Sequence, residues 1–190
     1  MSKTINENDY LEASKIIGCD VATIKAVKSV ESGKGGFLSN GLPTILFEAH
    51  IFSRLTGHKY DKTNPDISSR IWNKKLYLGG SYEHQRLDKA CKLDRNAGLQ
   101  SASWGLFQIM GFNYEACGFK TVQEFINAMY KSEGEHLKAF CNFVKNRGMA
   151  TYLINKQWAK FAYCYNGAGY LLNRYDTKLK QAYELLTKTK

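Results

Sequence analysis

Residues 27–48 read VKSVESGKGGFLSNGLPTILFE, and this stretch decides the fold. A helical pattern ends at Glu31, and residues 33–43 then carry four glycines and the dipeptide Asn40-Gly41, which is a strong signal for a hairpin turn. The run from Thr44 to Phe47 is typical of a short strand, and we expect helix again from Glu48 to Leu55. The stretch therefore predicts a small β-hairpin between two helices, with a carboxylate beside it.

Helix-capping signals stand on the N-terminal side of this stretch. Asp20 is expected to cap the helix that ends at Glu31. Asp9, followed three residues later by Glu12, predicts a capping box for a first helix. Gly18 is expected to stop that first helix, because glycine readily adopts the left-handed conformation of a helix end.

Helical signals also dominate after the stretch. A polar loop is expected at residues 58–80, followed by a helix over 81–93. Thr121 and Ser132 are each followed three residues later by a glutamate, which predicts two further capping boxes. Since neither an internal repeat nor an interdomain linker is visible, the sequence predicts one mainly α domain over residues 1–190 with one small sheet.

Composition restricts the class of protein. The chain has 44% hydrophobic residues and a net charge of +10, which predicts a packed core and favours a polyanionic partner such as nucleic acid, membrane or cell wall. Nucleic-acid motifs are lacking. Residues 1–9 lack the apolar run of a secretory signal, so we expect the chain to fold in a host bacterial cytoplasm. Five scattered cysteines and four histidines without metal-ligand spacing predict no metal and no cofactor.

The position of Glu31 suits one particular chemistry. Glycosidic cleavage needs a carboxylic acid that stays protonated near neutral pH and donates to the leaving oxygen. Apolar neighbours raise the pKa of a glutamate, and Val27, Val30 and Phe37 could supply such neighbours. Taken alone, a glutamate at a helix end is most often a solvated, structural residue.

Three motifs in a fixed order are more informative than Glu31 alone. Residues 31–33 (ESG), 103–109 (SWGLFQI) and 165–167 (YNG) resemble the lysozyme-like superfamily of goose-type lysozymes and lytic transglycosylases. In that superfamily the motifs are a catalytic glutamate, a Gly-Leu-x-Gln helix start and a Tyr-Asn turn. Residues 30–50 resemble the N-acetylmuramidase family of phage endolysins more closely still. The resemblance covers roughly residues 10 to 186, and it implies a lysozyme-like helical domain with a small β-hairpin or sheet beside the catalytic cleft.

The same resemblance implies an activity and two catalytic carboxylates. The family cleaves the β-1,4 bond between N-acetylmuramic acid and N-acetylglucosamine in peptidoglycan, which lyses the host cell. Glu31 matches the catalytic acid, and Glu48 matches a second glutamate that orients or activates water or binds sugar. Alternatively, Glu48 is a carboxylate that stabilises the start of a helix. A lytic transglycosylase acting on the same bond, with a sugar hydroxyl in place of water, is a further alternative.

Four more residues are expected to bind substrate on the strength of the resemblance. Ser103 and Gln108 belong to the motif that lines the cleft, although Gln108 could instead only satisfy backbone groups. Tyr165 and Asn166 belong to the Tyr-Asn turn, where the hydroxyl would lie near the acid. Neither a zinc-protease motif nor a serine-hydrolase elbow is present, so those enzyme classes are disfavoured.

The C-terminal residues 171–187 carry leucines and tyrosines at helical spacing among basic residues. The first interpretation is a helix that closes the core through Leu172, Tyr175 and Leu179. The second is a basic amphipathic helix that engages anionic outer-membrane lipid. The charge also leaves open a non-enzymatic cationic protein that disrupts membranes. Without a visible wall-binding module or signal peptide, we expect a monomer that reaches the wall after release by a holin.

Overall fold

The computed structural model describes residues 3–31 and 35–188, with the side chain of Glu31 excepted. Within these residues it contains eleven α-helices, two short 3-10 helices and three strands. In chain order they are α1 (Glu7–Ile17), α2 (Val21–Glu31), β1 (Ile45–Phe47), α3 (Ala49–Leu55), η1 (Lys74–Leu76), α4 (Tyr82–Leu93), α5 (Arg95–Gln100), β2 (Ala102–Trp104), β3 (Ile109–Met110), η2 (Gly111–Asn113), α6 (Val122–Lys131), α7 (Glu133–Asn146), α8 (Ala150–Ile154), α9 (Trp158–Asn166), α10 (Tyr170–Asn173) and α11 (Tyr175–Lys188). The predicted mainly α fold with one small sheet is confirmed.

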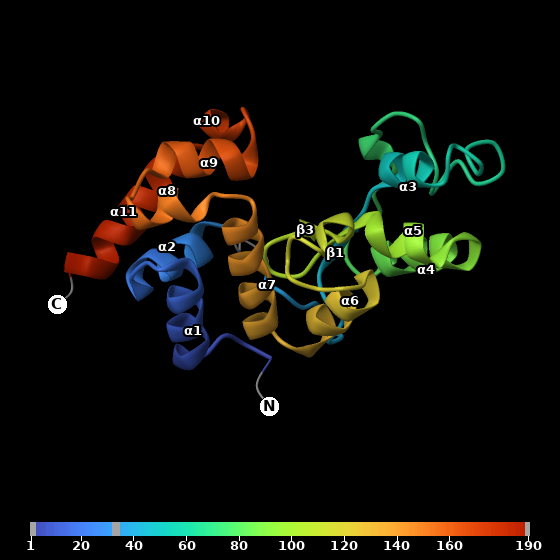
Figure 1. Cartoon of the computed structure of the whole chain (residues 1–190). Helices are drawn as coiled ribbons and strands as arrows, with labels where there is room; N and C mark the ends of the chain where they lie inside the picture. Colours follow the sequence, from blue (N-terminus) through green and yellow to red (C-terminus); the bar gives the residue numbers. More distant parts are fainter. Residues whose placement is uncertain (1–2, 32–34, 189–190) are drawn as a thin grey trace.

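The helices form two groups around the sheet. Figure 1 shows α1, α2 and α8 to α11 on one side of the molecule and α3, α4 and α5 on the other, with the sheet, α6 and α7 between them. Helix α11 packs against α2 and α9, α1 packs against α7, and α4 packs against α5 and β1. In the part of the chain that the structure describes, none of the helices is long and apolar enough to cross a lipid bilayer.

The first helix begins earlier than the sequence predicts. Asn6 is its N-cap, and its side chain accepts hydrogen bonds from the backbone of Asn8 and Asp9. The Asp9 carboxylate returns a bond to the Asn6 backbone, so the capping box joins Asn6 to Asp9, and the predicted pairing of Asp9 with Glu12 is wrong. The sequence contains two overlapping capping patterns, and the earlier one lengthens the helix. Gly18 ends α1 as predicted, with a φ of 83°.

Later helix boundaries follow the predicted caps. The Asp20 side chain accepts a backbone N–H from the first turn of α2 at 2.7 Å. Thr121 forms the complete capping box with Glu124, and the Ser132 side chain accepts the backbone N–H of the glutamate three residues on. The predicted loop at 58–80 contains only the short helix η1, and α4 follows it.

The sheet pairs segments that are far apart in the sequence. Strand β1 runs antiparallel to β2, with Leu46 opposite Ser103, and β2 pairs with β3, with Ser103 opposite Met110. The predicted hairpin at 33–43 is reduced to one bridge between Phe37 and Pro43; within it, residues 33 and 34 lie outside the described residues. β1 therefore pairs with β2, which contains Ser103 of the later motif.

The Gly-Leu-x-Gln segment is the turn between β2 and β3, so the expected helix start there is wrong. Both Gly105 and Gln108 have positive φ values, 68° and 49°, which reverse the chain within a few residues. A helix would need negative φ at these positions. The turn brings Gln108 back beside Ser103.

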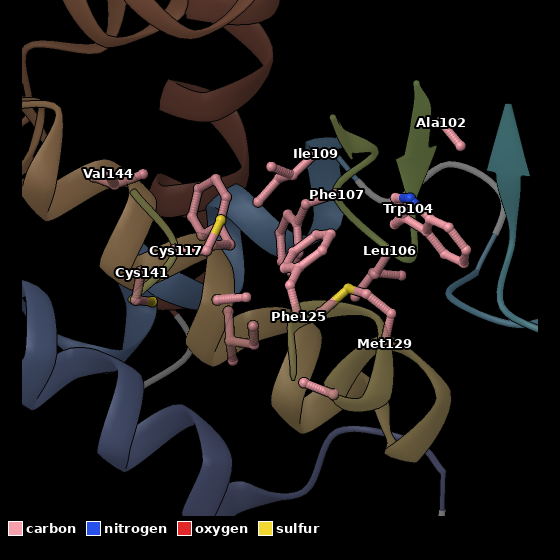
Figure 2. Close-up of a cluster of buried hydrophobic side chains, with 14 of the residues drawn as sticks. Ala102, Trp104, Leu106, Phe107, Ile109, Cys117, Phe125, Met129, Cys141 and Val144 are labelled. Carbon is pink, nitrogen blue, oxygen red and sulfur yellow. The ribbon is translucent and has the colours of Figure 1, made fainter. Parts of the chain in front are cut away.

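One part of the core lies between this turn and helices α6 and α7. Figure 2 shows the cluster, in which side chains from β2, the turn and β3 meet side chains from the two helices. Its labelled members are Ala102, Trp104, Leu106, Phe107, Ile109, Cys117, Phe125, Met129, Cys141 and Val144. All ten are buried, and the Phe107 ring stacks on Phe140 of α7 at a centroid distance of 4.3 Å. Packing of this kind fixes the β2–β3 turn against the helices.

The C-terminal segment is two helices. Arg174, with a φ of 53°, separates α10 from α11. Leu179 of α11 is fully buried, and the Tyr183 ring packs against Trp158 at 5.5 Å. Leu172 is 90% exposed, so the expectation that it covers the core is wrong, because α10 turns that residue away from α2 and α9. Helix α11 closes the helical group, and α10 stands outside it.

Candidate active site

A cavity of about 500 Å³ opens between residues 35–46 and the β2–β3 turn, which carries the second motif. Its walls come from the segment after α2, from β1, from the loop before α4 and from the β2–β3 turn. The lining residues are Gly35, Leu38, Thr44, Ile45, Leu46, Gly79, Gly80, Gly105, Leu106 and Gln108. The wall is rich in glycine backbone, which lets a polymeric ligand approach closely.

A buried histidine supports the floor of this cavity. His136 accepts the backbone N–H of Leu106 at Nδ1 (3.1 Å), and its Nε2 donates to the Met129 carbonyl at 2.7 Å. Burial lowers the pKa of His136 below 6.5, which keeps the ring neutral and able to accept. A Cβ at Gly36 or Gly105 would come within 2.7 or 2.8 Å of this ring. These glycines are required because the backbone lies directly on the imidazole.

Ser103 and Gln108 are brought together at the cavity wall. The Ser103 hydroxyl donates to Gln108 Oε1 at 2.9 Å, and Gln108 Nε2 donates to the carbonyls of Thr44 and Gly105. Gln108 thus satisfies backbone groups, as the alternative interpretation expected, and it also lines the cavity. Its side chain joins the segment before β1 to the turn after β2.

Glu48 follows β1 and its carboxylate is only 15% exposed. Along the strand Ile45 and Phe47 are buried, whereas Leu46 and Glu48 are half-buried. Ile45 and Leu46 line the cavity, and Glu48 follows Leu46 by two residues. Glu48 occupies the N-cap position of α3, but its side chain makes no capping hydrogen bond. Its carboxylate instead accepts the Tyr77 hydroxyl at 2.7 Å. Glu48 thus stands at the start of α3, as the alternative interpretation expected, but its side chain bonds elsewhere.

Glu31 is the last residue of α2, and its side chain lies outside the described residues, as do residues 32–34. Of the apolar neighbours expected around it, Val27 is buried, and Val30 and Phe37 are half-buried. The chain re-enters the described part at Gly35, which lines the cavity. Gly35 follows Glu31 by four residues, so the end of α2 lies within about 15 Å of a residue that lines the cavity.

Tyr165 and Asn166 end helix α9. The Tyr165 hydroxyl donates to the Phe107 carbonyl at 3.1 Å, directly before Gln108. Its ring stacks on Phe161 and meets Phe140 edge-on, so much of the side chain serves packing. Tyr165 thus ties α9 to the β2–β3 turn, and Asn166 lies at the helix end where the Tyr-Asn turn was predicted.

A buried ion pair that the sequence did not reveal holds the end of β1. The Glu83 carboxylate is fully buried and lies 2.8 Å from Arg86. It accepts the backbone N–H groups of Phe47, Leu78 and Gly79. Burial alone would raise the pKa of Glu83, but these backbone hydrogen bonds and the Arg86 charge hold it below its ordinary value. In the sequence, Glu83 is only one of several charged residues in the helix predicted over residues 81–93.

Two aromatic residues beside Glu48 were also missed. Trp72 donates its indole N–H to the Tyr77 oxygen at 2.7 Å, and Tyr77 in turn donates to Glu48. Both lie in the segment that the sequence marked only as a polar loop. In the described part of the chain no cluster of histidine, cysteine and carboxylate side chains could hold a metal ion. The described chemistry of the site is thus that of a carboxylate held by hydrogen bonds at the edge of a cavity.

The chain is similar to known proteins over most of its length. The model of a family described as N-acetylmuramidase matches residues 20–187. A crystal structure of the Burkholderia AP3 phage endolysin is 37% identical, has a TM-score of 0.93, and is matched over 100% of this chain and 73% of that chain. A search of curated proteins gives no significant match. The matched range includes every candidate site residue from Glu31 to Asn166.

Proposed function

Since this chain belongs to the N-acetylmuramidase family, we propose that the cavity between α2, β1 and the β2–β3 turn is where it cleaves peptidoglycan, with Glu31 and Glu48 as the reacting carboxylates. The protein is a peptidoglycan-hydrolysing glycosidase of the endolysin type. The bond attacked is the β-1,4 linkage between N-acetylmuramic acid and N-acetylglucosamine.

The observation that carries this proposal is the environment of Glu48. The Glu48 side chain makes no hydrogen bond to the first turn of α3, so its carboxylate is not used for capping. Its Oε2 is held by Tyr77 at 2.7 Å, two residues after Leu46, which lines the cavity. Holding a carboxylate in one orientation is what a general base or a charge-stabilising group requires.

The two carboxylates have complementary roles. Glu31 donates its proton to the glycosidic oxygen as the bond to the leaving sugar breaks. Glu48 accepts a proton from the water that attacks the anomeric carbon, so the new C–O bond forms as the old one breaks. Ser103 and Gln108 hold the cavity wall against which the glycan lies, and Tyr165 and Asn166 support it from α9. A second carboxylate favours hydrolysis over a transglycosylase, which needs only one.

The bond and the reaction are tested by analysing the ends of digested wall. Purified peptidoglycan is digested, reduced with borohydride and examined by mass spectrometry. Reduced muramic acid at the new ends is the expected result. Reduced glucosamine would assign cleavage to the other linkage, and 1,6-anhydromuramic ends would identify a transglycosylase and contradict the water-activating role of Glu48.

We further propose that residues 1–190 act as one monomeric muramidase domain that meets the wall after holin-mediated release from the host cytoplasm. The surface around α10 and α11 supports a second contact, with anionic outer-membrane lipid. Leu171 and Leu172 are 64% and 90% exposed, and Arg174, Lys178 and Lys180 are exposed beside them. Apolar and basic side chains together gain from a bilayer with anionic headgroups.

A further inference from the structure

An exposed tryptophan stands beside the Glu48 carboxylate. Trp72 is 59% exposed, whereas the other two tryptophans, Trp104 and Trp158, are 1% and 8% exposed. The same short segment exposes three more large apolar side chains, those of Ile71, Leu78 and Tyr82. Several such side chains close together in one segment of a soluble protein mark a binding surface.

The indole of Trp72 is fixed by its polar edge. Its N–H donates to the Tyr77 oxygen at 2.7 Å, and the two rings meet edge-on with centroids 6.3 Å apart and planes at 66°. This bond holds the edge of the indole while most of the side chain stays open to solvent. A ring that is already oriented loses little conformational entropy when a ligand stacks on it.

The direction of the hydrogen bonds from Trp72 to Glu48 is determined by their chemistry. An indole N–H can only donate, so the Tyr77 oxygen accepts from Trp72. The single hydroxyl hydrogen of Tyr77 is then directed to Glu48 Oε2 at 2.7 Å. Burial and the bond to Glu48 raise the pKa of Tyr77 to about 12, so the hydroxyl remains a donor at neutral pH.

The chain of bonds ends on one oxygen of Glu48 at the cavity edge. His50 Nδ1 also lies 3.2 Å from Oε2, whereas no described side chain or backbone group bonds to Oε1. The segment that carries Tyr77 continues to Gly79 and Gly80, which line the cavity. The hydrogen bonds therefore run from an exposed indole to the Glu48 carboxylate, two residues after the cavity-lining Leu46.

We propose that Trp72 is a sugar-stacking platform and that Tyr77 is a positioning residue which couples this platform to Glu48. The inference rests on the proposed role of Glu48. The C–H face of an N-acetylated pyranose would cover the indole and exclude water from the Trp72–Tyr77 bond. A hydrogen bond shielded from water is electrostatically stronger, so glycan binding fixes the Glu48 carboxylate as the substrate arrives.

The platform is tested by fluorescence. The probe is a soluble β-1,4-linked tetramer of N-acetylglucosamine, added to the inactive Glu31→Gln variant so that it is not consumed. Because Trp72 is the exposed indole, its emission should shift to the blue on binding, and Trp72→Phe should abolish the shift. An undiminished shift in the Trp72→Phe protein would overturn the platform.

The coupling is tested by kinetics on solubilised, uncross-linked peptidoglycan. Trp72→Ala should raise KM about tenfold, as loss of an aromatic anchor does. Tyr77→Phe should lower kcat about tenfold with KM within about twofold, because it disturbs the reacting group and leaves the platform. It should also move the acid limb of the kcat profile to higher pH, since a hydrogen bond to a carboxylate favours its ionised form. Tyr130→Phe, which alters a half-exposed hydroxyl on α6, is the matched control.

The outcomes separate this inference from the proposed function. An unchanged kcat and acid limb in Tyr77→Phe, together with an inactive Glu48→Gln protein, would overturn the coupling and leave the role of Glu48 intact. A fully active Glu48→Gln protein would overturn both. Melting temperatures are measured for every variant, and the fluorescence test on Trp72→Phe stands even if Tyr77→Phe folds poorly.

Discussion

The carboxylate of Glu83 accepts the backbone N–H of Phe47 at 3.1 Å, and thereby fixes the residue directly before Glu48. The same carboxylate holds the backbone of the loop between η1 and α4, at Leu78 and Gly79. Arg86 neutralises its charge and donates to the Phe47 carbonyl as well. One buried side chain of α4 therefore positions both β1 and the loop that carries Tyr77.

Glu83→Gln is expected to destabilise the protein by about 3–5 kcal/mol, because it leaves the Arg86 charge buried without its partner. Chemical unfolding at pH 7 measures the loss. The control is Lys89→Met on the same helix, which breaks an exposed ion pair with Asp66 and should cost less than about 1 kcal/mol.

A double variant tests why Glu83 is needed. Glu83→Leu with Arg86→Met removes both charges, and such replacements of a buried pair are often neutral. Here we expect no recovery, since the backbone N–H groups of Phe47, Leu78 and Gly79 would lose their acceptor. Wild-type stability in the double variant would show that Glu83 acts only as a counter-charge.

The helices could be predicted from the sequence because their signals are local. Caps at Asp20, Thr121 and Ser132 depend on residues within one turn, and all three form, although the box predicted at Ser132 is reduced to its N-cap bond. The sheet could not be predicted in the same way. Its pairing of Leu46 with Ser103 joins residues far apart in the chain, and only the fold selects such a partner. The helix expected after Ser103 failed because Gln108 takes a positive φ.

The residues of the candidate site show the same difference between local and long-range signals. Ser103 and Gln108 belong to one motif and are hydrogen-bonded to each other, and Gln108 lines the cavity. Tyr77 and Glu83 could not be identified as site residues from the sequence. Tyr77 is distinguished by its hydrogen bond to Glu48, which lies 29 residues earlier in the chain, and Glu83 by its bond to the buried backbone of Phe47, 36 residues earlier. Trp72 stands among other apolar residues of the loop, such as Ile71 and Tyr77, so its residue type alone does not distinguish it in the sequence.

Glu31→Gln should reduce hydrolysis of purified peptidoglycan by at least about 100-fold, since the amide cannot donate a proton to the leaving oxygen. The melting temperature should stay unchanged. Glu7→Gln, which alters an exposed carboxylate of α1, is the control and should retain full activity. Substantial hydrolysis of purified peptidoglycan by a folded Glu31→Gln protein would contradict the role of Glu31, and lysis of intact cells alone would instead favour disruption of membranes by the cationic surface.

Glu48→Gln should also cause a large loss of activity, although an incomplete one, and the fold should survive because the side chain caps no helix. If Glu48 activates water opposite Glu31, the two carboxyl groups lie roughly 6.5–9.5 Å apart and the product is inverted. Proton NMR of fresh product should then show the α anomer first. Initial appearance of the β anomer would rule out this role.

The buried His136 predicts a loss of stability on acidification. Burial lowers its pKa in the folded protein below 6.5, so the unfolded chain binds a proton that the folded protein excludes. Stability should therefore fall as pH falls below 6.5 towards the folded pKa, by up to about 1.4 kcal/mol per pH unit. Melting temperatures between pH 8 and pH 5 measure this dependence.

His136→Gln should flatten that dependence, since the amide can accept from Leu106 and donate to Met129 without titrating. A slope that is the same in wild type and His136→Gln would assign the acid sensitivity to other groups.

The exposed leucines of α10 predict a separation between wall cleavage and killing of intact cells. Leu171→Ser with Leu172→Ser should reduce killing of intact Gram-negative bacteria severalfold, because the surface would lose apolar side chains that can enter a bilayer. Hydrolysis of purified peptidoglycan, which offers no bilayer, should be unchanged. Binding to vesicles that contain anionic lipid, measured at low and high salt, checks the electrostatic part of the contact.

Deleting residues from Arg174 onward is the contrasting variant. That deletion removes Leu179, which is fully buried, and Tyr183, which packs on Trp158, so it should lower the melting temperature and both activities together. The double serine variant removes no buried contact of this kind and should melt as wild type does. Equal losses on cells and on purified wall in the serine variant would mean that α10 has no part in membrane contact, and that α11 serves only the core.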